Sequence, residues 1–276
     1  MIREECGVSV LISVYHKENP SFLYVSLRSI ANQTTPPQEI IVVKDGLLTP
    51  ELDEVIAQRS EKSSIQYRVI EFEINAGLGK ALNEGVKYCS HEWIARMDTD
   101  DIALPNRFEK QVDYIQNHPD TDIVGGWICE FDHDEKACEQ ERRVPKAHEE
   151  IEKFARYRNP MNHMTVMFKK SAVEEAGGYQ PMNGFEDYYL WMRMLIRGKR
   201  FANIPEVLVK ARIGSGMIER RRGWCYLKDE WHLEKAAYRL GFWRRGDLVR
   251  NLFYRMFPRV LPRIVVEKLY NLLRKF

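Results

Sequence analysis

Cysteine is scarce in this sequence, and its arrangement predicts neither a zinc site nor a disulfide framework. The five cysteines are scattered, odd in number and without a CxxC pair. Structural zinc sites and disulfide-stapled domains need cysteines at short, regular spacings. The pattern therefore favours a protein of a reducing compartment, and the cytoplasm is the default expectation.

Long hydrophobic runs are missing as well. No uncharged apolar stretch approaches the roughly 20 residues that a helix needs to cross a bilayer. Residues 1–5 are partly charged and lead directly into a strand-like segment, so we expect no secretory signal. The 276 residues also contain no internal repeat and no low-complexity linker, which predicts one large domain or one domain with an appendage.

Charge is nearly balanced overall, at +2, but it is unevenly distributed. Residues 239–276 contain ten basic and two acidic residues, so the other 238 residues carry a net charge of −6. In this tail, apolar pairs such as Leu248-Val249 and Leu252-Phe253 recur between the cations at helical intervals, with breaks expected at Pro258 and Pro262. A basic amphipathic helix is typical of a membrane surface. The alternatives are packing on the rest of the protein and nucleic-acid binding, of which the last is the least favoured.

Strand-like and helix-like segments alternate through the first half of the chain. Apolar, β-branched runs predict strands at residues 8–14, 39–45, 65–72 and 93–97, with helices between them. Such alternation is typical of a mostly parallel sheet with right-handed crossovers. The second half is more mixed, with helices expected at about 106–117 and 149–157, strands at about 123–131 and 165–168, a loop at 132–145, and helices from 224 onward.

Three carboxylates crowd the end of the fourth predicted strand. The apolar run 93–97 is followed by Asp98, Asp100 and Asp101. Such crowding is unfavourable unless a cation or several donors receive the charge. Mg²⁺ and Mn²⁺ prefer oxygen ligands and are often held by one or two carboxylates plus substrate phosphates. The cluster predicts a metal–phosphate site, and the alternative is a solvated acidic turn in which Asp98 or Asp101 caps the next helix.

Polar side chains also follow the other predicted strands. Because open α/β sheets bind ligands at the carboxyl ends of their strands, we expect these groups to share one site. An aspartate there can accept from a base N–H, an aromatic ring can pack on a base, and glycines allow close approach of the backbone. The residues concerned are Ser13, Tyr15 and Glu18 after the first strand, Asp45 after the second, and Asn75, Gly77 and Lys80 after the third.

Taken together, these segments resemble the inverting nucleotide-sugar glycosyltransferases of family 2, which have the GT-A fold. The resemblance covers residues 8–215. A bacterial branch that builds exopolysaccharide and O-antigen repeat units, which includes the amylovoran-type glycosyltransferases, is similar over residues 159–171 and the following Gly177-Gly178-Tyr179. The family motifs occur in order as residues 8–15, Asp45-Gly46, Asn75-x-Gly77-x-x-x-Ala81-x-Asn83-x-Gly85, residues 97–101 and residues 185–188.

The resemblance implies roles for the residues at the strand ends. Asp100 would ligate Mn²⁺ or Mg²⁺, and Asp98 would contact the ribose or the metal, whereas Asp101 is the least certain of the three. The ion would neutralise charge on the departing diphosphate. The remaining nucleotide-sugar contacts would come from Ser13, Tyr15, Glu18, Asp45, Asn75, Gly77, Lys80 and Thr99.

An inverting transfer also needs a base that removes the proton of the acceptor hydroxyl. By resemblance this base is Asp187, and repulsion from the adjacent Glu186 is expected to raise a carboxylate pKa. The alternative is that both acids simply favour the first turn of a helix. Candidates for contacts with the acceptor or the diphosphate are His163, Glu186, Trp191, Arg220 and Arg221. His163 is equally compatible with a structural role, and Trp191 with a place in the core.

The resulting hypothesis is a metal-dependent enzyme that moves a hexose, galactose or glucose by resemblance, from a UDP-sugar to a polyprenyl-diphosphate-linked saccharide. We expect a GT-A catalytic domain at residues 1–222, with a nucleotide-binding half at about 1–104 and an acceptor half at about 105–222. A helical, basic extension at 223–276 would contact the inner face of the cell membrane, and no nucleic-acid partner is expected. The alternative is a non-catalytic sugar-nucleotide-binding or assembly protein with the same fold.

Overall fold

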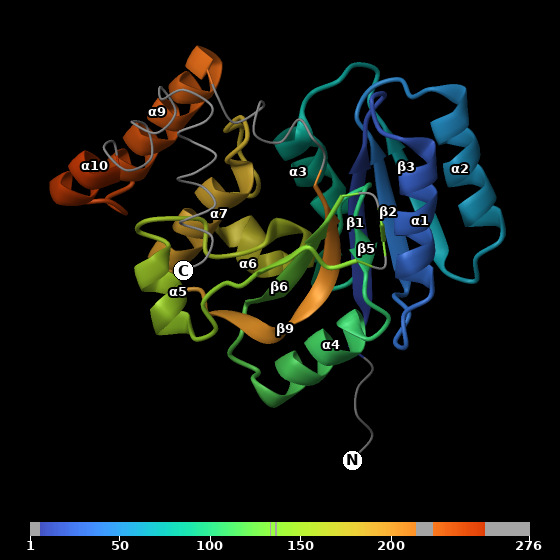
Figure 1. Ribbon diagram of the computed structural model, residues 1–276, viewed down its shortest axis with the longest axis horizontal. Coiled ribbons are helices and arrows are strands. Elements are labelled where there is room, and N and C mark those ends of the chain that lie inside the picture. Colours follow the sequence, from blue (N-terminus) through green and yellow to red (C-terminus); the bar gives the residue numbers. More distant parts are fainter. Residues whose placement is uncertain (1–5, 133, 136, 214–222, 252–276) are drawn as a thin grey trace.

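The protein folds around one mixed β-sheet with helices on both faces (Figure 1). The computed structural model describes residues 6–132, 134–135, 137–213 and 223–251. The strand order is β3-β2-β1-β4-β8-β6-β9-β5, and β7 pairs with β6 beside this path. The strands are β1 Val8–Val14, β2 Glu39–Lys44, β3 Gln66–Glu71, β4 Trp93–Arg96, β5 Ile102–Ala103, β6 Ile123–Phe131, β7 Gln140–Arg142, β8 Met167–Lys169 and β9 Phe201–Arg212.

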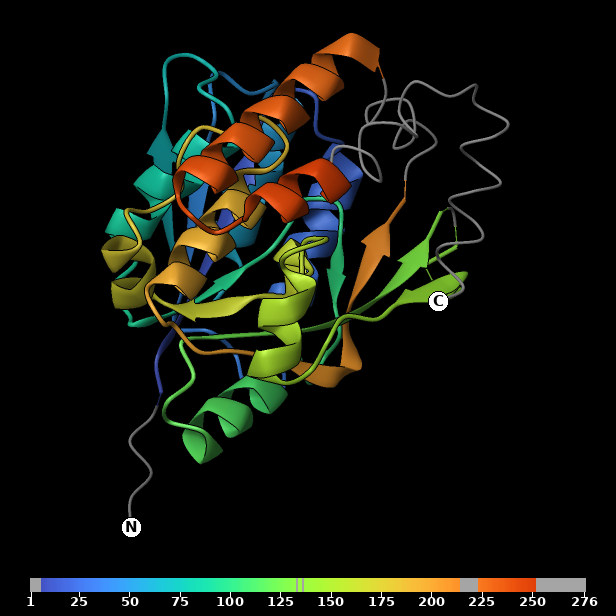
Figure 2. The same ribbon diagram turned by 90° about the vertical axis from the view of Figure 1, so that its left-hand side faces the viewer.

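The helices divide between the two faces of this sheet, as the perpendicular view also shows (Figure 2). Helices α1, α2 and α4 bury their apolar residues with one face of β1, whereas α3, α5, α6, α7 and α9 bury theirs with the other. The helices are α1 Pro20–Ala31, α2 Pro50–Glu61, α3 Leu78–Tyr88, α4 Arg107–Asn117, α5 His148–Phe154, α6 Lys170–Glu175, α7 Glu186–Ile196, α9 Gly223–Arg239 and α10 Arg245–Asn251, with a 3-10 turn η1 at His163–Thr165.

The amino-terminal half has the predicted parallel arrangement. Strand β1 pairs in parallel with β2 and with β4, and β2 pairs in parallel with β3. Successive side chains of a strand point to opposite faces, so Val10 and Ile12 pack towards α1 and α2 while Leu11 packs towards α3. Burial on both faces explains why β1 and β2 are almost entirely apolar. This register brings the carboxyl ends of β1, β2 and β4 to one edge.

The second half of the sheet contains antiparallel pairs that the sequence did not indicate. Strand β8 is antiparallel to both β4 and β6, and β5 is antiparallel to β9. Strand β9 was not predicted. Its pairing with β6 is interrupted by an irregularity at which Ile204 and Val207 face adjacent residues of β6, leaving Pro205 and Glu206 between them. Proline cannot donate a ladder hydrogen bond and belongs at such a bulge.

One disulfide corrects the expectation that the cysteines stay unbridged. Strand β7 runs back antiparallel along β6, inside the segment expected to be a loop. This hairpin brings the Cα atoms of Cys129 and Cys138 to 5.5 Å, and their sulfur atoms are bonded. The pairing depends on the return of the chain in space, which the scattered spacing of cysteines along the sequence does not reveal.

Helices α9 and α10 pack on the rest of the protein. Leu233, Ala237 and Trp243 are buried in the same apolar cluster as α3 and α7. The side chain of Arg156 donates to the carbonyl of Phe242 at 3.0 Å. Among the described residues, no helix is both long enough and apolar enough to span a membrane. The expected membrane helices beyond residue 251 lie outside the described residues.

Candidate functional site

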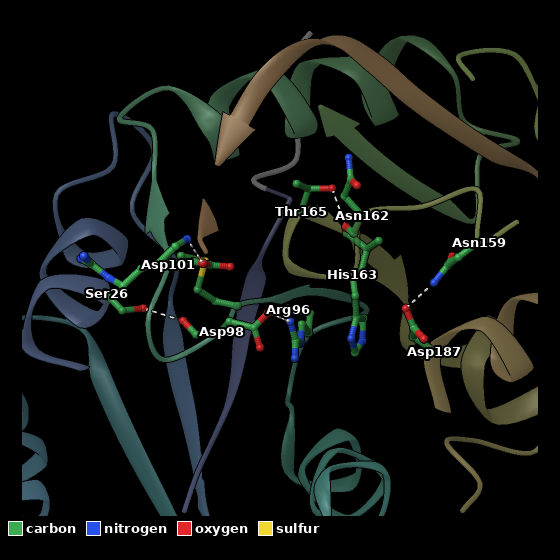
Figure 3. A network of polar contacts seen from close by, with 12 residues as sticks. Ser26, Arg96, Asp98, Asp101, Asn159, Asn162, His163, Thr165 and Asp187 are labelled. Atoms are coloured by element: carbon green, nitrogen blue, oxygen red, sulfur yellow. Dashed lines mark hydrogen bonds and ion pairs between the residues drawn. The ribbon is translucent and has the colours of Figure 1, made fainter. Parts of the chain in front are cut away.

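The acidic cluster lies at the end of β4, beside a buried arginine (Figure 3). Arg96, which is 2% exposed, forms an ion pair through Nη1 with Oδ2 of Asp98. The main chain of Asp98 is held by Ser26 of α1, whose hydroxyl donates to its carbonyl at 2.8 Å. Thr99 is buried at 4% exposure. The start of the cluster is therefore fixed from two sides.

Asp100 and Asp101 have raised pKa values for the same main reason. Burial, followed by the negative charge of Asp98, raises the pKa of Asp100 to about 6. Burial also raises the pKa of Asp101 well above its usual range, with Asp98 and Asp100 adding to the shift. Oδ1 of Asp101 accepts from the main-chain N–H of Arg212 at 2.8 Å. Asp101 thus joins β9 to this corner rather than capping α4, which begins at Arg107.

The donor set of this corner fits a hard divalent cation. Asp98 and Asp100 supply carboxylate oxygens, and Oδ2 of Asp101 is buried with no hydrogen-bond partner in the described part of the chain. In that part, no three His, Cys, Asp or Glu side chains converge as a complete protein metal site would. A cation held by one or two carboxylates and by substrate phosphates does not require such a cage.

The loop after β3 is pinned to the end of β2 by Asp45. The buried carboxylate of Asp45 accepts from the N–H groups of Ala76, at 2.6 Å, and Gly77, at 3.0 Å. The side-chain amide of Asn75 donates to the Asp45 carbonyl at 3.1 Å. Gly77 has φ +89°, a conformation that favours glycine. Each Asp45 oxygen retains a lone pair that could accept a further hydrogen bond. The predicted contact of Asp45 with uracil is therefore compatible with these bonds, and it stays a prediction.

The residues after β1 lie next to this loop. Val14 pairs with Lys44, which places Tyr15 beside Asp45 at the same edge. Ser13, Tyr15 and Glu18 are half-buried, and the N–H of Glu18 donates to the carbonyl of Tyr15 at 3.1 Å. Lys80 is exposed in the first turn of α3. The sheet thus brings these predicted nucleotide residues to one edge.

Asp187 lies in the first turn of α7 and is held by two hydrogen bonds, of which Figure 3 shows the one from Asn159. Its Oδ2 accepts from the amide of Asn159 at 2.6 Å, and its Oδ1 accepts from the N–H of Tyr188 at 2.7 Å. Burial raises the pKa of Asp187, while these two hydrogen bonds oppose the shift. The pKa of Glu186 rises to about 7 because of burial and the neighbouring Asp187. Gly79 of α3 lets Glu186 approach closely, since a Cβ there would lie 3.3 Å from its Cβ.

His163 lies between the acidic corner and Asp187 (Figure 3). Its Nε2 is 2.8 Å from the hydroxyl of Tyr179. Burial and the charge of Arg96 lower the pKa of His163 well below its usual range, which favours the uncharged imidazole. Trp191 packs edge-on against His163 and has no exposed surface. Trp191 is therefore a core residue and is not available for the predicted contact with an acceptor.

Three residues of this site were not singled out from the sequence. Arg96 carries the only visible signal, a charged side chain inside an otherwise apolar strand. Asn159 and Arg212 join the site through contacts made at long range, with Asp187 and Asp101 respectively. The predicted candidates Arg220 and Arg221 lie outside the described residues.

Comparison with known proteins gives a consistent result. The family model described as Glycosyl transferase family 2 matches residues 9–175. "Amylovoran biosynthesis glycosyltransferase AmsE" of Erwinia amylovora is 43% identical over 270 residues, which are 97% of this chain and 99% of that protein. "UDP-Gal:alpha-D-GlcNAc-diphosphoundecaprenol beta-1,3-galactosyltransferase" of Escherichia coli is 36% identical over 254 residues, which are 92% and 91% of the two chains.

A solved structure agrees in fold. The complex of S. aureus TarS 1-349 with UDP-GlcNAc superposes with a TM-score of 0.68 at 16% identity, and covers 93% of this chain and 76% of that one. A second structure, a mannosyltransferase of Pyrobaculum calidifontis with GDP-Man and Mn²⁺, gives a TM-score of 0.60 at 16% identity and covers 98% and 80%. At such identities the likeness concerns the fold alone, and the expected GT-A-type fold is confirmed.

Proposed function

This chain belongs to glycosyl transferase family 2, and we propose that it transfers a hexose from a UDP-sugar to a polyprenyl-diphosphate-linked saccharide during the assembly of a bacterial surface polysaccharide. The chain is a glycosyltransferase by family. The single observation that carries the proposed chemistry is the half-buried, hydrogen-bonded Asp187 in a site that also holds Asp98 and Asp100. The galactosyltransferase relative favours galactose as the transferred sugar, with glucose as the second candidate.

Asp187 is the proposed base of an inverting transfer. Both of its oxygens are oriented by hydrogen bonds, and each retains a lone pair for the proton of the acceptor hydroxyl. Burial brings its pKa up from the usual range of a carboxylic acid, which makes it a better proton acceptor. The acceptor oxygen would attack the anomeric carbon from the side opposite the diphosphate, so the anomeric configuration inverts.

The donor is proposed to lie along the strand ends. Tyr15 and Asp45 would contact the uracil, together with Ser13 and Glu18, whereas Asn75, Gly77, Lys80 and Thr99 would contact the rest of the nucleotide sugar. Asp100 and Asp98 would hold Mn²⁺ or Mg²⁺. When bound, this ion supplies positive charge that stabilises the departing diphosphate. His163 and Glu186 are proposed to line the side that faces the acceptor.

The proposed location is the cytoplasmic face of the cell membrane, where a polyprenyl-linked acceptor would be presented. The division into a catalytic domain at 1–222 and an extension at 223–276 stays a proposal. The basic tail supports this location, because anionic lipids attract clustered Lys and Arg side chains. A second candidate, a non-catalytic sugar-nucleotide-binding protein, is disfavoured by the presence of Asp98, Asp100 and Asp187 in one site.

A donor screen tests this function. Purified protein is incubated with a lipid-diphosphate sugar acceptor, Mn²⁺ or Mg²⁺, and a panel of UDP-sugars, and released UDP is measured. We expect one donor to be turned over, the product to have inverted anomeric configuration, and chelation to abolish UDP release. Binding of UDP-sugars without turnover of any donor would favour the non-catalytic alternative.

A further inference from the structure

The end of α5 and helix α10 together form a basic surface outside the site. Its residues are exposed and are mostly cations, accompanied by a tyrosine that is 48% exposed and a valine that is 67% exposed. We call this surface the basic face, and it consists of Lys153, Tyr157, Arg158, Arg244, Arg245 and Val249.

Internal contacts hold the two parts of the basic face together. The guanidinium of Arg250 stacks on the ring of Tyr157 at 3.9 Å. The side chains of Arg250 and Asn251 both donate to the carbonyl of Arg156, at 3.0 and 3.1 Å. The position of α10 relative to α5 is therefore fixed, and the exposed cations form one platform rather than two separate segments.

The charge of this platform is strongly positive. Segments 153–158 and 244–251 contain six basic residues and a single acidic one, Asp247. Asp247 is engaged by Arg156 at 3.6 Å and by Arg250 at 3.1 Å, so its charge is neutralised from within. Three exposed acids of α5 lie near Lys153. Glu149 pairs with Arg200 at 3.7 Å, and Glu150 accepts from the N–H groups of Lys146 and Ala147, whereas Glu152 adjoins Lys153 and lowers the positive charge there. Lys153, Arg158, Arg244 and Arg245 are left to face an external anion.

The chain continues from this platform with the same chemistry. Residues 252–276 follow α10 directly and contain six basic residues and one acidic residue among many apolar ones. Clustered cations next to exposed aromatic and aliphatic side chains are the combination that binds the interface of an anionic membrane. A nucleic acid would be favoured by the charge alone but would not use the exposed Val249.

We propose that the basic face is the part of the folded body that docks on an anionic membrane surface, and that it does so through residues 153–158, at and after the end of α5, as well as through α10. This inference rests on the proposed function, because only a lipid-linked acceptor requires the enzyme to face a membrane. It extends that function by adding Lys153, Tyr157 and Arg158, which belong to the catalytic part and not to the C-terminal extension.

The basic face lies on the same side of the molecule as Asp187, so contact with a membrane there would place the lipid-linked acceptor near the proposed base. Arg158 is followed in the chain by Asn159, whose amide holds Asp187. Helix α10 lies at the opposite end of the molecule from α1 and α2 (Figure 1). A membrane that contacts the basic face therefore lies on the side of the proposed base, where the sugar of a lipid-linked acceptor has to enter.

The test compares two matched triple variants of the full chain. One variant, Lys153→Gln, Tyr157→Ser and Arg158→Gln, removes two cations and the exposed tyrosine from the basic face. The control, Tyr24→Ser, Arg28→Gln and Lys62→Gln, removes the same groups from α1 and the end of α2. Tyr24 is 38% exposed and carries the guanidinium of Arg59, which the control retains just as the first variant retains Arg250. Sedimentation with vesicles of phosphatidylcholine, with and without phosphatidylglycerol, measures binding.

Because one Lys or Arg near an anionic surface contributes about fivefold to partitioning, we expect the first variant to bind anionic vesicles at least about tenfold more weakly than wild type. The control variant should bind as wild type does, and the difference should shrink at high salt. If both triple variants bound anionic vesicles as tightly as wild type, the proposal would be overturned. If both bound them more weakly than wild type by the same factor, the attraction would be general and without a defined face, which would also overturn the proposal.

A second readout separates this inference from the proposed function. Transfer to a short-chain, water-soluble analogue of the acceptor is measured for the same two variants. We expect activity within about twofold of wild type for both, since none of the six residues contacts the site. Absence of transfer by the wild type itself would contradict the proposed function, while the vesicle experiment would still decide whether the basic face binds lipid.

Discussion

Burial is the main cause of the raised pKa of both Glu186 and Asp187, but the secondary influences on the two carboxylates differ. The sequence predicted that Glu186 and Asp187 raise each other's pKa by repulsion. Repulsion from Asp187 does contribute to the raised pKa of Glu186, after burial. The pKa of Asp187 is raised by burial and held down by its hydrogen bonds to Asn159 and Tyr188. Asp187 is therefore the better oriented of the two for accepting a proton.

Replacement of the proposed base tests its assignment. We expect Asp187→Asn to abolish transfer and to leave nucleotide binding almost intact, because the amide keeps the size of the side chain but cannot take the acceptor proton. Turnover and calorimetric binding of UDP are measured on the same preparation. The control is Asp113→Asn on the exposed side of α4, which should behave as wild type. Near-normal turnover by Asp187→Asn would eliminate this residue as the base.

Glu186 should leave a signature in the pH dependence of stability. Its pKa is about 7 in the folded protein, so between about pH 4.5 and 7 the folded state retains a proton that the unfolded chain has released. The unfolding free energy therefore falls as pH rises through this range. Glu186→Gln removes this contribution.

Urea unfolding measures the unfolding free energy of wild type and Glu186→Gln at about pH 5 and about pH 8. The decrease in this free energy from the lower to the higher pH should be smaller in the variant by about 1–3 kcal/mol. The difference between the two proteins cancels the similar contributions of Asp100, Asp101 and Asp187. Identical pH dependence in both proteins would mean that the Glu186 carboxyl titrates normally.

At the scale of elements, the first half of the fold follows from local pattern and the second half does not. Strands β1 and β2 each contain an apolar run, at residues 10–12 and 40–43, because both faces of the sheet are buried there, and such runs are visible in a sequence. Strand β9 could not be predicted from an apolar run, because Pro205 and Glu206 interrupt the strand at the bulge. Strand β7 is short and polar, and it is defined only by its pairing with β6.

The site was predictable to a similar extent. The positions of Asp45, Asn75 and Asp98 follow from their places at strand ends, so the sequence could bring them to one edge. Arg212 could not be found in this way, because its contact with Asp101 joins residues that are 111 positions apart in the chain. Likewise, the complete burial of Trp191 depends on how α7 packs against its neighbours. A helical pattern in the sequence does not determine that packing.

The packing of α3 on the sheet depends on Gly85. A Cβ at this position would collide with Cδ1 of Leu11 and lie 2.8 Å from Cγ2 of Val43. Although alanine favours a helix, overpacking of a filled core costs more, so we expect Gly85→Ala to destabilise the protein by about 1–3 kcal/mol. Thermal unfolding measures this change. Gly246→Ala on α10 is the control, because a Cβ there meets nothing within 4 Å, and a loss of stability as large as that of Gly85→Ala would refute the packing argument.

At the scale of the whole molecule, the described C-terminal helices share the core of the catalytic part. Trp243 is 1% exposed, and its ring contacts Tyr188 of α7 edge-on. Arg156, next to α5, stacks on Phe242 and donates to its carbonyl. We therefore expect α9 and α10 to unfold together with the sheet in one transition.

Two tryptophans distinguish this expectation from an independently folded extension. Trp243→Ala should destabilise the whole protein by about 3–5 kcal/mol, because a large buried side chain is lost. Trp224→Ala should change stability by less than about 0.5 kcal/mol, since Trp224 is 83% exposed on α9. Urea unfolding is followed by circular dichroism and by UDP binding. A Trp243→Ala variant that loses helical signal while it still binds UDP would indicate two separate folding units.

The hydrogen bonds of Asp45 also have a consequence for how specifically the donor nucleotide would be recognised. Ordering the backbone of one residue costs about 1–2 kcal/mol, and Ala76 and Gly77 are already ordered by this carboxylate when the protein folds. The proposed nucleotide pocket would therefore lose little entropy on being occupied. It also cannot reshape itself around a different base, so the fidelity of this enzyme for its nucleotide would be set before any donor arrives.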